Sequence, residues 1–87
     1  MKSLSKDDHI RVILEFYKAG YITVLEKDKL LLLILINYNN KALEISTNVD
    51  GRELHYAYWM GWTSMSVKDD FVISYNVKSH TFFEGEL

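Results

Sequence analysis

The chain contains no cysteine and no proline. Without cysteine it can form no disulfide, no thiolate metal site and no cysteine nucleophile. Without proline, no strand is interrupted and no loop is stiffened by a fixed backbone angle. A chain without cysteine suits a reducing compartment, and we expect a cytoplasmic protein.

Long apolar runs and clusters of basic charge are also missing. The longest apolar run covers residues 30–36, far short of the ~20 residues that cross a bilayer. Residues 1–8 carry charges where a signal peptide needs an apolar core. The 10 Lys and Arg are scattered, and 12 Asp and Glu give a net charge of −2, unlike the basic patch of a nucleic-acid-binding protein. We therefore expect a soluble protein that binds neither membrane nor nucleic acid.

Length and hydrophobic content predict one small domain spanning residues 1–87. A chain of 87 residues has room for one core, and a hydrophobic fraction of 48% is enough to build it. Intrinsic disorder is excluded by the same fraction.

The first segment has the pattern of an amphipathic helix over residues 5–19. Ser5 and Asp8 have the spacing of a capping box, and Gly20 suits the left-handed residue after a helix end. Apolar residues recur at helical spacing between these signals: Ile10, Ile13, Leu14 and Tyr17.

The rest of the chain is interpreted as strands. Residues 21–25 and 30–38 are the first two, the second central to the sheet, although its leucines also permit a buried helix. Asn39 and Asn40 would form a hairpin turn before a strand over 42–47.

The second half continues in the same pattern. Asp50-Gly51 predicts a tight hairpin, followed by strands over 54–60, 71–77 and 81–84, with a break at 61–64. Ser66 and Asp69 form a second potential capping box, which leaves a helix over 66–76 as an alternative. The resulting fold class is α+β: one N-terminal helix packed on an antiparallel sheet of five or six strands.

Catalytic and metal-binding patterns are weak. His9, His55 and His80 have no spacing that ties them together, although Lys41 or Lys78 could complete an RNA-cleaving group. No zinc motif, phosphate-binding loop or nucleophile elbow is present. We expect no cofactor, no metal and no catalytic residue; a small nuclease or hydrolase using His55 or His80 is the alternative.

The acidic residues occur in pairs. Asp7-Asp8 fits the start of a helix, Asp69-Asp70 fits a solvated loop, and Glu84 and Glu86 lie at the C-terminal end. These carboxylates could also complement a basic cleft on a partner protein.

The segment 56–65 is unusually rich in aromatic residues and methionine. It holds both tryptophans, and Trp, Tyr and Met are typical of binding surfaces. The alternative is ordinary packing of aromatics within the sheet. The candidate partner-binding residues are Tyr58, Trp59, Met60, Trp62, Asp69 and Asp70.

By elimination, these features predict a small acidic protein-binding module. It would be an inhibitor or immunity-type protein that neutralises a partner, such as a basic toxin or nuclease. A homo-oligomer that uses the same face, or a non-catalytic subunit of a larger assembly, is a further alternative.

Overall fold

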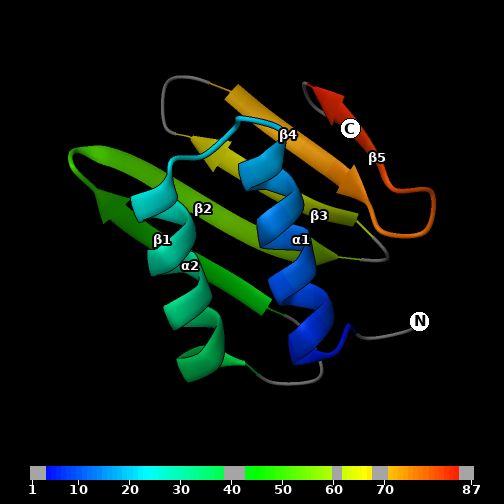
Figure 1. The fold of residues 1–87 in the computed structure, drawn as a ribbon, viewed down its shortest axis with the longest axis horizontal. Coiled ribbons are helices and arrows are strands. Elements are labelled where there is room, and N and C mark those ends of the chain that lie inside the picture. The colour runs from blue at the N-terminus through cyan, green and yellow to red at the C-terminus, as the bar shows by residue number, and fades with distance from the viewer. Residues whose placement is uncertain (1–3, 39–42, 60–61, 68–70, 85–87) are drawn as a thin grey trace.

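The structure, a computed structural model, describes residues 4–38, 43–59, 62–67 and 71–84. It has two layers, with two helices lying side by side on one face of a five-stranded antiparallel sheet (Figure 1). The α+β class and the five strands are confirmed. The prediction of a single helix is wrong, because a second helix takes the place of the first two expected strands.

Helix α1 (Lys6–Lys18) forms as its sequence signals predict. The Ser5 hydroxyl accepts a hydrogen bond from the Asp8 backbone N–H (3.2 Å), and the Asp8 carboxylate accepts one from the Ser5 N–H (3.3 Å). These bonds hold the pKa of Asp8 below its usual value. Gly20 follows the helix with φ +86°, a conformation that glycine adopts without a Cβ penalty.

Helix α2 (Val24–Asn37) corrects two predicted strands, 21–25 and 30–38, and the turn placed between them. A second capping box starts it: the Thr23 hydroxyl accepts from the Glu26 N–H (3.2 Å), and Glu26 accepts from the Thr23 N–H (2.8 Å). The leucine-rich run is long enough for a helix once this start is recognised. The expected hairpin at Asn39-Asn40 lies outside the described residues.

The sheet is a meander in which each strand pairs with its neighbour in the chain (Figure 1). Its strands are β1 (Leu43–Val49), β2 (Arg52–Trp59), β3 (Trp62–Val67), β4 (Phe71–Asn76) and β5 (Thr81–Glu84). The Asp50-Gly51 turn is confirmed, with φ of +52° and +84°. The final strand, 81–84, is also confirmed.

The structure contradicts two interpretations of residues 61–76, where it has the strands β3 and β4. The break expected at 61–64 is wrong, because β3 begins at Trp62 and pairs in register with β2 from that residue onward. The helix considered for 66–76 is also wrong, because residues 71–76 are the strand β4. The β-branched and aromatic content of this stretch explains the outcome.

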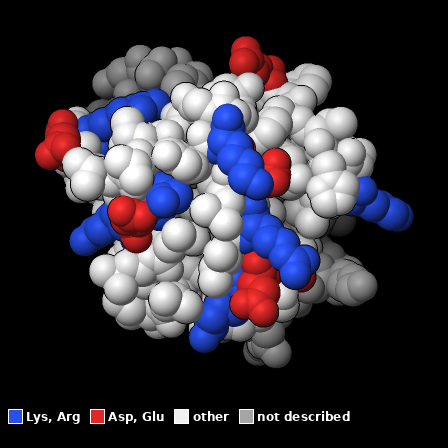
Figure 2. Space-filling view, viewed as in Figure 1, with Lys and Arg blue, Asp and Glu red and all other residues white. Residues whose placement is uncertain are grey.

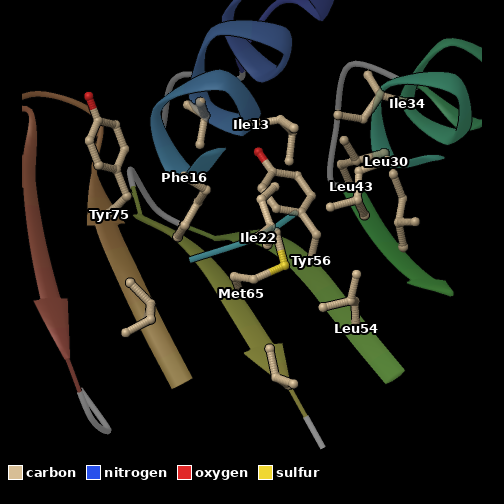
Figure 3. Close-up of a cluster of buried hydrophobic side chains, with 14 residues drawn as sticks. Ile13, Phe16, Ile22, Leu30, Ile34, Leu43, Leu54, Tyr56, Met65 and Tyr75 are labelled. Carbon is tan, nitrogen blue, oxygen red and sulfur yellow. The ribbon is translucent and has the colours of Figure 1, made fainter. Parts of the chain in front are cut away.

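The core lies between the helices and one face of the sheet. Figure 3 shows Ile13 and Phe16 of α1 and Leu30 and Ile34 of α2 converging on side chains from the strands. Tyr56 is fully buried near the centre. Neither helix in the described part of the chain has the length and apolar character needed to span a bilayer.

Candidate protein-binding surface

The sheet has one face covered by helices, and no helix or strand among the described residues covers the other. Side chains alternate along each strand, and every second residue of β3 is buried: Thr63, Met65 and Val67. The residues between them, Trp62, Ser64 and Ser66, are half-buried and belong to the opposite face. We call this opposite face the open face. From β1, β2, β4 and β5 it takes Glu44, Ser46, Asn48, Glu53, His55, Ala57, Val72, Ser74, Asn76, Thr81 and Phe83.

Small side chains occupy the middle of the open face. The register aligns Ala57 with Ser64 and Ser64 with Ser74 across three neighbouring strands. Near the β1–β2 hairpin, a shallow depression of about 440 Å³ has Ser46, His55 and Ser66 among its lining residues. Ser46 is exposed at this depression, so a partner could approach the sheet there, whereas Ser74 in the middle of the face is 1% exposed.

A hydrogen-bonded pair stands beside the depression. The Nε2 atom of His55 lies 2.8 Å from a carboxylate oxygen of Glu44 on the adjacent strand. The side chains are 38% and 73% exposed, respectively. This pair offers a carboxylate and an imidazole to a partner, whereas a general base would also need a positioned nucleophile or substrate. Ser46 and Ser66 are the register neighbours of His55, but the structure shows no hydrogen bond from either to it.

The other two histidines are hydrogen-bonded to tyrosine side chains. His9 is 2% exposed, and its Nδ1 lies 2.8 Å from the Tyr56 hydroxyl. Burial lowers the pKa of His9 to about 4 and raises that of Tyr56, so both groups are neutral near pH 7. His80 bonds through Nδ1 to the Tyr75 hydroxyl at 2.9 Å. The three histidines therefore lie in separate environments, and no His–His–Lys group forms among the described residues.

The six predicted binding residues have different placements. Tyr58 is in the core, 6% exposed, with its ring 5.6 Å from that of His9, so it does not contribute directly to an outer surface. Trp62 is half-buried on the open face. The backbone of Trp59 pairs with that of Trp62 at the end of the β2–β3 hairpin. Met60, Asp69 and Asp70 lie outside the described residues.

The acidic pairs are partly explained by local structure. Asp8 completes the first capping box, which confirms the helix-start interpretation of Asp7-Asp8. Glu84 accepts a hydrogen bond from the Tyr21 hydroxyl at 3.1 Å. No group of three His, Asp or Glu side chains in the described part of the chain could hold a metal ion.

Sequence reasoning missed two surfaces. The open face was missed apart from its aromatic end, because its register depends on β3, which was interpreted as a break. The outer face of α2 was missed because this segment was interpreted as a buried strand. The capping-box spacing of Thr23 and Glu26 could have revealed the helix.

Comparisons with known proteins do not add to this geometry. The sequence matches no protein-family model, and searches of curated proteins and of solved structures found no significant similarity.

Proposed function

We propose that this protein is a non-catalytic binding module of the inhibitor or immunity type, and that its open face docks on a basic surface of a partner protein. The observation that carries the proposal is the sign of the charge on the open face. Among the described residues, the open face has the exposed carboxylate of Glu44 and no Lys or Arg.

The helix side of the molecule, in contrast, carries charges of both signs. Figure 2 views the helix side and shows Lys and Arg interspersed with Asp and Glu. The side chain of Arg52 also reaches toward this side, because it donates to Glu26 of α2 (3.1 Å). The two helices carry five basic residues, Lys6, Arg11, Lys18, Lys27 and Lys29, and five acidic ones, Asp7, Asp8, Glu15, Glu26 and Asp28. A face with negative charge and no positive charge favours the approach of a positively charged partner and speeds their encounter.

Apolar side chains at the edges of the open face would supply affinity. Trp62 is half-buried, and Phe83 on the edge strand is 50% exposed. Aromatic residues of this kind become binding hot spots when a partner completes their burial. The exposed Ser46 at the depression would let the partner approach the sheet closely.

The test begins with capture of the partner from the source cell on the immobilised protein, followed by binding kinetics. Trp62→Ala should weaken affinity by about thirtyfold or more. Glu44→Gln should slow association and reduce its dependence on salt. Lys18→Gln on α1 is the matched control, because its side chain is 69% exposed on the helix side, and it should leave binding unchanged. Loss of binding in the control, with both open-face variants unaffected, would contradict the proposal.

The catalytic alternative is tested with the same proteins. If His55 were a catalytic base oriented by Glu44, the purified wild type would hydrolyse RNA or a model ester, and His55→Ala would abolish the activity. We expect neither substrate to be cleaved by the wild type. We also expect no catalytic role for His80, whose ring is hydrogen-bonded to the Tyr75 hydroxyl. Cleavage by the wild type that is lost in His80→Ala would contradict this expectation.

A further inference from the structure

The outer face of α2 is apolar although it faces solvent. Among the described residues, seven large hydrophobic side chains are exposed, and five of them lie on this helix. They are Val24 (49% exposed), Leu25 (58%), Leu32 (51%), Leu35 (53%) and Ile36 (68%). We call these five residues the α2 stripe. A contiguous apolar surface of this kind marks an interaction site more often than isolated exposed residues do.

The α2 stripe is not needed to hold the helix on the sheet. The inward side of α2 is buried through Glu26, Leu30 and Ile34, one helical turn apart from each other. The stripe lies on the opposite side. A helix that is apolar on both sides is expected where both sides are covered.

Two charged residues lie between the apolar residues of the α2 stripe, and their order indicates which partner the stripe binds. Asp28 and Lys29 are both exposed and adjacent. Leu25 lies three residues before Asp28, and Leu32 lies three residues after Lys29. At 100° per residue, Leu25, Asp28, Lys29 and Leu32 project from the same side of the helix.

This order is complementary to itself when one copy is reversed. If two α2 helices pack antiparallel about a two-fold axis between residues 28 and 29, Asp28 of each copy meets Lys29 of the other. Leu25 then meets Leu32, and Leu35 and Ile36 lie against the start of the other helix, where Val24 is exposed. A two-fold interface requires this kind of self-complementary surface.

From this match we propose that the chain forms a two-fold homodimer through the α2 stripe. Figure 1 places α2 at one side of the helix layer, and α2 packs on the edge strand β1, so its outer face is accessible to a second copy. In Figure 2, charged side chains lie over the N-terminal half of this helix, and residues 30–37 add none. The dimer does not depend on the proposed function, because the open face lies on the other side of the sheet.

The first measurement is the mass of the full chain by sedimentation equilibrium across micromolar to sub-millimolar concentrations. The wild type should approach twice the 10.2 kDa mass of one chain. Leu32→Asp places a charge at the interface in both copies and should raise the dissociation constant at least about thirtyfold. Phe83→Asp is the matched control, because Phe83 is equally exposed (50%) but lies on β5, and this variant should remain a dimer.

Charge reversal tests the antiparallel register. Lys29→Asp gives each copy two adjacent carboxylates, which face the same two carboxylates of the other copy across the axis. This repulsion should weaken the dimer about tenfold or more at low salt. Adding Asp28→Lys restores opposite charges across the axis and should restore most of the affinity. Asp28 also lies 3.2 Å from Lys27 within its own chain, so circular dichroism of each variant should verify the fold.

Three results would overturn the proposal. The first is a wild type that sediments as a single chain over the whole range. The second is a dimer that survives Leu32→Asp. The third is a double charge variant that dimerises no better than Lys29→Asp alone. A monomeric wild type whose capture of another protein is lost in Leu32→Asp would assign the α2 stripe to a different protein.

Discussion

The Nδ1 atom of His9 lies 2.8 Å from the hydroxyl of Tyr56 inside the core. The imidazole is also surrounded by aromatic rings, with those of Tyr38 and Tyr58 within 6.0 Å. This environment stabilises a neutral imidazole, so a residue that the sequence offers as an acid–base group belongs to the packing of α1 on the sheet.

The burial of His9 predicts a specific pH dependence of stability. Burial lowers its pKa to about 4 in the folded protein, whereas an unfolded histidine titrates near 6.5. As the pH falls from about 6.5 to 4, the unfolded chain gains a proton that the folded chain does not. The free energy of unfolding should therefore decrease by about 3 kcal/mol over this window, and this contribution should stay constant below it.

Urea unfolding of the wild type and of His9→Gln at pH 7.5 and 4.5 measures this effect. Glutamine can retain a hydrogen bond to Tyr56 but does not titrate. The wild type should lose about 2.5 kcal/mol more than the variant between the two pH values. An equal loss in both proteins would show that His9 does not resist protonation in the folded state.

Glu26 and Arg52 should respond unequally to substitution. The Glu26 carboxylate is 2% exposed and accepts from Arg52 Nη1 at 3.1 Å, while the Arg52 side chain is 32% exposed. Arg52→Met leaves a buried carboxylate without its cation and should cost about 3 kcal/mol. Glu26→Gln removes the buried charge and keeps an acceptor for the Thr23 N–H, so about 1 kcal/mol is expected. Equal losses in chemical denaturation would contradict this assignment.

The two capping boxes predict matched effects at the starts of both helices. Ser5→Ala and Thr23→Ala each remove the side-chain acceptor of one box and should lower the free energy of unfolding by about 0.5–2 kcal/mol. Since the hydrogen bonds are separate, the double variant should show the sum of the two losses. An unchanged urea midpoint for Thr23→Ala would indicate that the box does not stabilise α2.

Gly51 should be sensitive to substitution for a conformational reason. Its φ is +84°, and a Cβ added to it would meet no atom within 4 Å. Gly51→Ala should therefore lose about 1–2 kcal/mol through left-handed strain alone. Gly51→Asn should lose less, because asparagine tolerates this conformation. The melting temperatures of the two variants distinguish backbone strain from a steric clash. A clash would destabilise Gly51→Asn more than Gly51→Ala, because asparagine is the larger residue.

The parts of the fold that the sequence predicts correctly carry their signal locally. Ser5 and Asp8 start α1, and Asp50-Gly51 closes the first hairpin, each through neighbouring residues. The α2 segment was misinterpreted because its outward side is as apolar as its inward side, which removes the 3.6-residue periodicity. A helix predicted from amphipathic spacing is missed when its outer face is itself apolar.

The candidate site was harder to predict than the fold. Trp62 was identified from its residue type, but its place on the open face, on the strand next to that of His55, requires the cross-strand register. Tyr58 carries the same aromatic signal and lies in the core. Residue type alone does not separate the two, because alternate residues of a strand face opposite sides of the sheet.

The order of the sheet has a consequence for the speed of folding. Every strand pairs with the strand next to it in the chain, and α1 contacts α2 in the same way. A chain with such local pairing closes short loops and has a low contact order, which favours rapid folding. The main long-range step is the docking of the helical pair on the finished meander, where His9 of α1 meets Tyr56 of β2, 47 positions away.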